Sequence, residues 1–352
     1  MQKNKPVALP QFIELGEKKI AGLSKILNKH RLVSKSVMLL CDENTACIGG
    51  QEILIMLRKE NLKVSEHRVD NSDDQNVERV EEKIKAERPN LVIGFGGGKV
   101  LDVAKLAAGL TGPKCVSIPT TLSNDGLASP VSVITNSKNI PVSHITKAPY
   151  GVIIDLDIIK KAPRRHLMAG VGDLISNLSA VFDTRLALQK QREEINDNAL
   201  QLAESGGQRL LQLETSEIES NKFLQTLAHG LVKSGFAMCI WGTSRPASGS
   251  EHKISHSIDH YYSRRTGLHG EQVGIAAIFT MALQNNTYLK AARAFYAKIG
   301  FPCTLEYLGL TLTDFTKVVT NATKIRPERY TILEDKRPTK NEIERLVDFL
   351  GL

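Results

Sequence analysis

The chain has 352 residues, of which 41% are apolar and 24% are charged, as expected for a folded protein long enough for two domains. No apolar run reaches the roughly 18 residues of a membrane span, and the N-terminus carries no secretory signal pattern, so we expect a cytoplasmic protein without membrane insertion. Five widely spaced cysteines without a CxxC pair argue against a zinc-thiolate or disulfide framework. The net charge of +8 is scattered and aromatic residues are only 5%, which suits anionic small molecules at least as well as nucleic acid.

The first half of the chain alternates predicted helices with short apolar strands. Helical periodicity is found over residues 12–27, 51–58, 77–86 and from about Lys99 onward. Strand patterns are found at residues 37–41, 64–69, 91–95, 115–119 and 151–155. Repeated strand and helix units of this length predict a parallel sheet with helices on both faces.

The pattern changes after Pro163, because the later segments have helical periodicity and almost no strand signal. These segments are residues 174–188, 195–213, 223–239 and 271–297. We therefore predict an α/β domain over residues 1–162 and an all-α domain over residues 163–352.

A glycine cluster follows the predicted strand at residues 91–95. In "LVIGFGGGKVLDVAK" it comprises Gly94, Gly96, Gly97 and Gly98 and leads into a helix with one apolar face. Glycines let the backbone approach a ligand closely, and the free N–H groups at a helix start favour an anion. The spacing is neither GxGxxG nor a Walker A loop, because Lys99 stands at the third position and Val100 follows it. The motif is compatible with two interpretations, a phosphate-binding turn and an ordinary tight turn.

A second polar loop follows the predicted strand at residues 115–119. "PTTLSNDGLASP" carries the polar side chains of Thr120, Thr121, Ser123, Asn124, Asp125 and Ser129. Ligands of open parallel sheets bind beyond the carboxyl ends of the strands, where this loop and the glycine cluster would meet. Hydroxyl groups suit a diphosphate or a ribose, and Asp125 suits a substrate hydroxyl. The alternative is a solvated loop with an Asx turn at Asn124.

Histidines gather in "SEHKISHSIDH", which contains His252, His256 and His260. The i, i+4 spacing puts His252 and His256 on one helix face, close enough to share a metal or a substrate. Further donors are Asp173 in "GVGDLIS" and His269 in "GLHGEQVG", each where a glycine turn is predicted to enter a helix. A solvated histidine face, a helix N-cap and an ordinary turn residue are the respective alternatives.

The ordered motifs resemble one known family. "GFGGGKVLDVAK", "PTTLSNDGLASP", "GVGDLISN", "SRPASGSEHKISHSIDH", "GLHGEQVG" and "KIRPERYTIL" look like those of the sn-glycerol-1-phosphate dehydrogenases, within the iron-containing alcohol dehydrogenase and dehydroquinate synthase-like superfamily. The resemblance implies a Rossmann-like domain over residues 1–162 that binds a nicotinamide dinucleotide. It implies a helical metal- and substrate-binding domain over residues 163–352. The implied reaction is reversible reduction of dihydroxyacetone phosphate to sn-glycerol 1-phosphate with NAD(H) or NADP(H).

The resemblance also implies roles for individual residues. Asp173, His252 and His269 are expected to hold one divalent metal, zinc foremost, with nickel or iron as alternatives. Asp125, Asp173 and His256 match substrate-contacting positions, and Asp173 and His256 are the expected catalytic residues. Cofactor contacts are expected from Gly96, Gly97, Gly98, Lys99, Val100, Thr120, Thr121, Leu122, Ser123 and Ser129. The expected partner is a small phosphorylated three-carbon substrate, with no nucleic acid, and the chain is expected to form a homo-oligomer.

The chemistry of the reaction specifies what the metal and His256 would do, and it adds three arginines as further candidates. Three protein ligands leave a divalent metal with open positions for the substrate oxygens. His256, one turn from His252, is the expected proton donor or relay, although a histidine at this offset can also bind metal. The substrate phosphate requires cationic partners, and the candidates on chemistry alone are Arg245, Arg326 and Arg329, for which surface positions are the alternative.

The segment "CDENT" places Asp42 and Glu43 directly after a predicted strand, and an acidic residue there binds ribose hydroxyls and repels a 2′-phosphate, which favours NADH. Three rival functions remain at this point. A dehydrogenase on the same scaffold could act on another polyol, polyol phosphate or ketone. A lyase related to dehydroquinate synthase would need further basic and acidic residues that we do not find. A nucleic-acid-binding protein would bind nucleic acid more weakly as the salt concentration rises, and chelators would not change its affinity.

Overall fold

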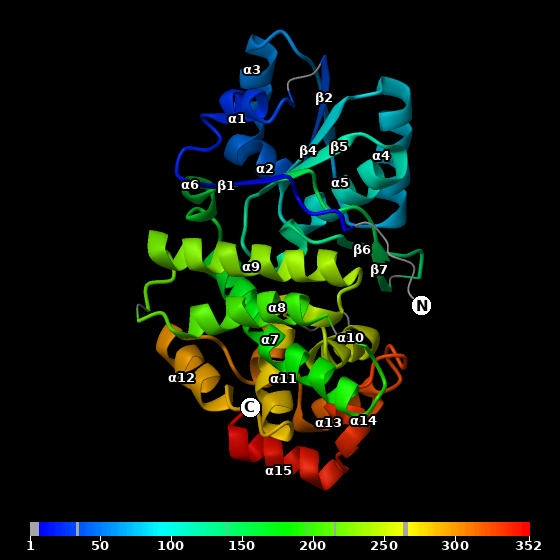
Figure 1. Ribbon diagram of the computed structural model, residues 1–352, viewed down its shortest axis with the longest axis vertical. Coiled ribbons are helices and arrows are strands. Elements are labelled where there is room, and N and C mark those ends of the chain that lie inside the picture. Colours follow the sequence, from blue (N-terminus) through cyan, green and yellow to red (C-terminus); the bar gives the residue numbers. More distant parts are fainter. Residues whose placement is uncertain (1–6, 33–34, 139, 195, 215, 263–266) are drawn as a thin grey trace. The chain divides into compact units, whose positions relative to one another are not determined.

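A computed structural model describes residues 7–32, 35–138, 140–194, 196–214, 216–262 and 267–352 (Figure 1). The chain divides into two compact units, residues 1–163 and residues 164–352. The first unit contains a parallel sheet with helices, and the second unit is helical. Within the described ranges, no helix combines the length and the apolar character that a membrane crossing requires.

The sheet of the first unit has six parallel strands in the order β1-β8-β5-β4-β2-β3. They are β1 (Phe12–Gly16), β2 (Ser36–Cys41), β3 (Lys63–Arg68), β4 (Leu91–Gly96), β5 (Lys114–Pro119) and β8 (Gly151–Asp155). β4 and β8 are buried along their whole length, which explains why β4 and the first four residues of β8 have no polar side chain, since both faces of a parallel sheet are covered. The five predicted strands are confirmed.

Helices cover both faces of this sheet, as predicted (Figure 1). The helices of this unit are α1 (Leu23–Lys29), α2 (Glu43–Thr45), α3 (Gln51–Lys59), α4 (Asp74–Glu87), α5 (Gly98–Thr111) and α6 (Leu156–Ile159), with a short π-helix η1 (Ala46–Gly50) and a 3₁₀ helix η2 (Asp125–Leu127). Successive strand residues point to opposite faces. Leu39 and Ile93 therefore pack with residues of α1 and α3, while Met38 and Val92 pack with residues of α4 and α5.

Two features of the first unit differ from the sequence prediction. The helix predicted over residues 12–27 is wrong, because Phe12–Gly16 is strand β1 and the helix α1 begins only at Leu23. β1 pairs along its length with β8, far away in the sequence, and a local apolar pattern cannot reveal such a partner. A hairpin of β6 (Val131–Thr135) and β7 (Pro141–Ile145) was not predicted.

The second unit is built from helices. They are α7 (Arg164–Gln189), α8 (Asp197–Leu211), α9 (Asn221–Trp241), α10 (Ser250–Tyr262), α11 (His269–Leu283), α12 (Leu289–Ile299), α13 (Leu312–Ala322), α14 (Ile332–Lys336) and α15 (Lys340–Leu350), with short turns η3 (Arg245–Ala247) and η4 (Glu306–Leu308). The three helices predicted over residues 174–188, 195–213 and 223–239 correspond to α7, α8 and α9, although residue 195 itself lies outside the described residues.

The single helix predicted over residues 271–297 is wrong, because α11 and α12 are separate helices. The chain turns at Asn285, whose backbone has a left-handed φ of 50°. The buried amide of Asn286 stabilises this turn by donating to the Leu178 carbonyl oxygen. Asparagine adopts the left-handed conformation more readily than most residues do, so these two residues stop the helix although the apolar spacing continues.

Candidate metal centre

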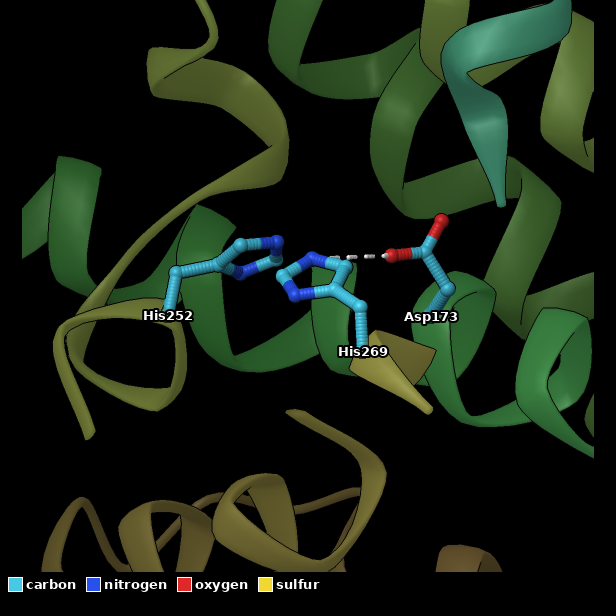
Figure 2. A group of neighbouring side chains, drawn as sticks. All are labelled: Asp173, His252 and His269. Carbon is cyan, nitrogen blue, oxygen red and sulfur yellow. Dashed lines mark ion pairs between the residues drawn. The ribbon is translucent and has the colours of Figure 1, made fainter. Parts of the chain in front are cut away.

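Three side chains from three helices of the second unit point toward one another (Figure 2). Asp173 comes from α7, His252 from α10 and His269 from α11. Each offers a ligand atom, and these atoms all lie within 4.8 Å of one another. His269 Nε2 is 3.9 Å from Asp173 Oδ1. One carboxylate and two imidazoles form a donor set that suits zinc, nickel or iron(II), so these residues fit a divalent metal.

Close contact between α7 and α11 brings two of these donors together. A Cβ atom on Gly172 would lie 2.1 Å from the carbonyl oxygen of Gly270, and a Cβ atom on Gly270 would lie 1.9 Å from that of Ala169. Only glycine permits this approach of the two backbones. Asp173 adjoins the first glycine and His269 adjoins the second, so the helix contact sets their separation.

Asp173 lies inside α7, and the prediction that it stands where a glycine turn enters a helix is wrong. The neighbouring glycines Gly170 and Gly172 are helical, and Gly172 permits the close packing against α11. The alternative role of Asp173 as a helix N-cap is thereby excluded. The side chain is almost fully buried, and a carboxylate buried in the middle of a helix requires partners.

The three histidines of α10 occupy different surroundings. The His256 ring centroid is 6.4 Å from that of His252 and 6.2 Å from that of His269, while the rings of His252 and His269 are 5.0 Å apart. His256 therefore adjoins the candidate metal ligands. His260 is exposed and contacts the ring of Tyr261, as expected of a histidine outside the site.

The imidazoles near the centre are kept neutral. Burial, followed by the charges of Arg326 and Arg329, lowers the pKa of His252 to about 3. Burial and neighbouring cationic groups also lower the pKa values of His256 and His269. Neutral imidazole retains the lone pair that binds a metal, so the surroundings favour the ligand form of these residues.

Two arginines lie close enough to these histidines to lower their pKa values. Arg326 Nη1 donates to Ser244 Oγ at 3.4 Å, and Arg329 Nη2 donates to the same oxygen at 2.9 Å. Burial, with the like charges of Arg326 and Arg245, lowers the pKa of Arg329 to about 9. Burial also lowers the pKa of Arg326, and two guanidinium groups this close together are stabilised by an anion.

Arg245 has a different role from the one its chemistry suggested. Its guanidinium is almost fully buried, donates from Nε to Glu193 Oε2 at 2.6 Å, and donates from Nη2 to the Tyr330 carbonyl oxygen at 2.8 Å. These bonds join η3 to the segment between α7 and α8 and to the segment before α14. We therefore assign Arg245 to the structure of the unit and exclude it from the phosphate candidates.

The glycine cluster of the first unit forms the turn from β4 to α5, and its glycines serve two purposes. A Cβ atom on Gly96 would lie 2.6 Å from Val100 Cβ, so this glycine permits close packing of the helix on the strand. Gly97 is the N-cap of α5 and supplies no capping side chain. A Cβ atom there would lie 3.8 Å from Thr121 Oγ1, and one on Gly98 would lie 3.4 Å from Asn124 Nδ2.

The polar loop therefore adjoins the glycine turn. The loop supplies hydroxyl groups and the N-terminus of α5 supplies backbone N–H groups, and this combination suits a diphosphate. Thr121 Oγ1 donates to Ser123 Oγ at 3.3 Å. Leu122 is fully buried, Thr120 is largely buried, and Ser129 Oγ accepts from the Val131 backbone N–H at 3.4 Å.

Asp125 is the middle residue of an Asx turn in which Asn124 Oδ1 accepts from the Gly126 N–H at 2.9 Å. It begins η2 in the first unit, and its contact with substrate stays a prediction.

Lys105 was missed by the sequence analysis and holds this loop in place. It lies among the apolar residues of α5, is buried, and donates from Nζ to the carbonyl oxygens of Gly126 and Val131. Asp102 Oδ1 lies 3.1 Å from the same Nζ. A lysine on the apolar side of "VLDVAKLAAGL" was the available signal, because a buried ammonium requires partners.

Comparison with known proteins identifies the family. Residues 14–163 match the model of the iron-containing alcohol dehydrogenase family. The glycerol-1-phosphate dehydrogenase (NAD(P)+) of Methanosphaera stadtmanae is 36% identical over 342 residues, which cover 97% of this chain and 96% of the relative. The protein of that name from Hyperthermus butylicus is 35% identical over 349 residues, 98% of each chain. The chain belongs to the glycerol-1-phosphate dehydrogenase family.

Solved structures show that this family member has the predicted fold. Glycerol dehydrogenase from Schizosaccharomyces pombe superposes with a TM-score of 0.80 at 21% identity, covering 99% of this chain and 91% of that one. A probable glycerol dehydrogenase from Sinorhizobium meliloti gives 0.78 at 19% identity, covering 98% of both chains. The expected fold class, a Rossmann-like parallel-sheet part followed by an all-α part, is confirmed.

Proposed function

We propose that this member of the glycerol-1-phosphate dehydrogenase family reduces dihydroxyacetone phosphate reversibly to sn-glycerol 1-phosphate, using NAD(P)H and a divalent metal. The observation that supports this most strongly is that the side chains of Asp173, His252 and His269 converge. They do so close enough to Arg326 and Arg329 for these two charges to lower the pKa of His252. A metal-ligand set suits alcohol and carbonyl chemistry, and adjacent guanidinium groups suit a phosphate ester. The printed names of the relatives agree with this substrate.

Asp173, His252 and His269 would hold the metal, which we propose is zinc, with nickel and iron as alternatives. Bound there, it would supply a Lewis acid that polarises the substrate carbonyl. The Asp173 carboxylate would lie beside the reacting oxygens of the substrate. His256 can pass a proton through its two ring nitrogens, because its lowered pKa keeps it neutral. We keep Asp125 as a predicted contact of the substrate hydroxyl.

The phosphate of the substrate would bind Arg326 and Arg329. Both guanidinium groups donate to Ser244 Oγ, which holds them side by side. Arg326 also lowers the pKa values of three histidines at the candidate metal centre, so its charge acts where the substrate would lie. A dianionic phosphate would relieve the repulsion between the two cations.

The nicotinamide cofactor would bind the first unit and would supply the hydride. We propose that the diphosphate lies at Gly96, Gly97, Gly98, Lys99 and Val100, and that Thr120, Thr121, Leu122, Ser123 and Ser129 surround the rest of the cofactor. These residues fit the group, because the start of α5 has no capping side chain and the space above Gly97 is open as far as Thr121.

We propose that the chain prefers NADH to NADPH. Asp42 directly follows β2, the neighbour of β4 in the sheet. Hydrogen bonds from Thr45 and the nearby Lys99 outweigh burial and lower the pKa of this carboxyl. A carboxylate at this place accepts from ribose hydroxyls and repels a 2′-phosphate. We also propose that the enzyme works in the cytoplasm as a homo-oligomer.

The test is to follow NADH oxidation by the zinc-loaded enzyme with dihydroxyacetone phosphate, dihydroxyacetone and a panel of ketones. The proposal predicts a much higher kcat/KM for the phosphate ester, mainly through a lower KM. Equal efficiency with the free ketone would overturn it and would favour a dehydrogenase for another polyol or ketone.

A further inference from the structure

The imidazoles of both proposed histidine ligands have a hydrogen-bond partner at Nδ1. Glu251 Oε1 lies 2.9 Å from His252 Nδ1, and Ser255 Oγ lies 3.2 Å from His269 Nδ1. Both partners are fully buried residues of α10. Nothing in the proposed reaction uses them, so their placement against the two ligands requires an explanation.

The direction of the bond at His252 follows from a second contact of the same oxygen. Glu251 Oε1 also accepts from the Gly249 backbone N–H at 2.6 Å, and a backbone N–H can only donate. The oxygen that accepts a backbone N–H at this distance is a carboxylate or carbonyl oxygen and not the hydroxyl of a protonated acid, so the proton of the bond to His252 comes from Nδ1. The lone pair of His252 is then on Nε2.

The direction of the bond at His269 follows from a chain of three residues. Gln272 Nε2 donates to Asp259 Oδ1 at 3.0 Å, which turns the amide oxygen toward Ser255. Ser255 Oγ donates to that oxygen at 2.6 Å, so its single proton is already used. Ser255 Oγ can then only accept from His269 Nδ1, which leaves the lone pair of His269 on Nε2.

We propose that Glu251 and Ser255 are positioning residues that hold both ligand histidines as the Nδ1–H tautomer, with Nε2 ready to bind the metal. His269 Nε2 is the atom that lies 3.9 Å from the Asp173 carboxylate, so the lone pair points toward the third ligand. A histidine that donates its other N–H to a fixed acceptor is oriented and made more basic toward a metal. The proposal rests on the metal centre of the proposed function.

α10 contains a matched control for Ser255. Ser257 is also fully buried, and its hydroxyl donates to the Val318 carbonyl oxygen at 2.9 Å. Substitution of either serine by alanine removes one buried hydroxyl and one or two hydrogen bonds from the same helix. Only Ser255 contacts a proposed ligand, so a difference between the two variants reports on the ligand and not on the stability of the helix.

The first measurement is the affinity of the metal-free full chain for zinc, determined by competition with a chromophoric chelator. Ser255→Ala is expected to bind zinc about 10- to 100-fold more weakly than wild type, and Ser257→Ala is expected to bind like wild type. Equal affinities in both serine variants would overturn the proposal. If wild type binds no zinc, the metal centre itself fails, and this outcome is distinct from failure of the tautomer assignment.

The second measurement is the tautomer itself, from long-range ¹H–¹⁵N NMR spectra of metal-free protein labelled at histidine. His252 and His269 are expected as Nδ1–H forms in wild type and in Ser257→Ala, and His269 is expected to populate the Nε2–H form in Ser255→Ala. Signals are assigned with the His252→Ala and His269→Ala variants. An Nε2–H form of His252 or His269 in wild type would refute the proposal.

Glu251 is tested by two substitutions that differ in what they retain. Glu251→Gln keeps an amide oxygen that can accept from Gly249 and His252, so it is expected to keep the Nδ1–H tautomer and most of the zinc affinity. Glu251→Ala removes the acceptor and is expected to lose both. Loss of affinity in the glutamine variant with the His252 tautomer unchanged would show that charge, and not tautomer, is what Glu251 contributes.

Discussion

The two units build their proposed sites from different parts of the chain. In the first unit, the turn from β4 to α5 offers backbone N–H groups and a glycine cradle, and the loop after β5 lies against it. In the second unit, the site consists of side chains that three separate helices bring together. A backbone site depends on the absence of side chains, whereas a side-chain site depends on helix packing and on each individual ligand.

The largest effect should come from removing a metal ligand. We expect His252→Ala to lose zinc and to reduce dihydroxyacetone phosphate at least about 10³-fold less efficiently. NADH affinity should be unchanged, because the glycine turn belongs to the other unit. Steady-state kinetics, metal analysis and NADH fluorescence titration measure the three properties. The control is His260→Ala, an exposed histidine of the same helix, and a loss of zinc there would contradict the division of roles.

The complementary experiment introduces a side chain into the proposed cofactor site of the first unit, which is built from backbone groups. A Cβ atom at Gly97 would lie at the ordinary contact distance of 3.8 Å from Thr121 Oγ1, so Gly97→Val should keep the fold, but its side chain would occupy the diphosphate cradle and raise the Kd for NADH about 10- to 100-fold. Zinc binding should be unaffected. Gly96→Ala is the contrasting variant, because its Cβ would meet Val100 at 2.6 Å and cost about 1–3 kcal/mol of stability. Unchanged NADH binding in Gly97→Val would place the cofactor elsewhere.

A smaller effect is expected at the proposed phosphate site. Arg326→Gln should raise KM for dihydroxyacetone phosphate about 10- to 100-fold, the value of one or two charge-assisted hydrogen bonds, and should leave activity with dihydroxyacetone nearly unchanged. Arg337→Gln is a matched control, because Arg337 is exposed and shares the left-handed backbone of Arg326. An equal loss with both ketones would mean that Arg326 supports the fold and does not bind phosphate.

Asp42 is expected to have a weaker and more selective effect. Asp42→Asn should improve the ratio of NADPH to NADH efficiency about tenfold, because it removes a negative charge that repels the 2′-phosphate. The Thr45 backbone N–H can still donate to the amide oxygen, so the cap of α2 is retained. The measurement is kcat/KM with each cofactor at saturating substrate. An unchanged ratio of NADPH to NADH efficiency would show that Asp42 does not contact the cofactor.

The smallest effect concerns the stability of the first unit alone. Glu14 on β1 accepts from Lys29 and His30, and these bonds lower its pKa from 4.5 to about 2. A lowered folded-state pKa stabilises the protein above the unfolded value, and this contribution is lost as the pH falls from about 4.5 toward 2.

The expected contribution of Glu14 at pH 7 is about 1 kcal/mol after solvent screening. Urea unfolding of Glu14→Gln should therefore approach wild type near pH 2 and differ from it at pH 7. Glu82→Gln, on an exposed face of α4, serves as the control. A difference that persists at pH 2 would contradict the assignment.

The same contrast explains what the sequence could predict. The glycine turn and the polar loop are continuous motifs placed next to buried strands, so their position at the sheet edge follows from local patterns. The motifs around the metal candidates identified Asp173, His252 and His269 only through a family resemblance, because their meeting depends on how α7, α10 and α11 pack. The Gly172 and Gly270 contact that sets this packing has no local signature.

Other features were hidden because long-range contacts determine them. β1 is a strand because β8 pairs with it, although its apolar spacing also suits a helix. Glu251 and Ser255 resemble ordinary polar residues of "GSEHKISH" until the imidazoles are placed beside them. Arg245 was a reasonable phosphate candidate by charge, and only its bonds to Glu193 and Tyr330 reveal a structural role.

The most direct test of the proposed function is the configuration of the product. Dihydroxyacetone phosphate is reduced with NADH by the zinc-loaded enzyme, and the product is offered to a dehydrogenase specific for sn-glycerol 3-phosphate. We predict that NADH is consumed and that the product is not oxidised, as expected of sn-glycerol 1-phosphate. Complete oxidation of the product by that dehydrogenase, or no consumption of NADH, would contradict the proposed reaction.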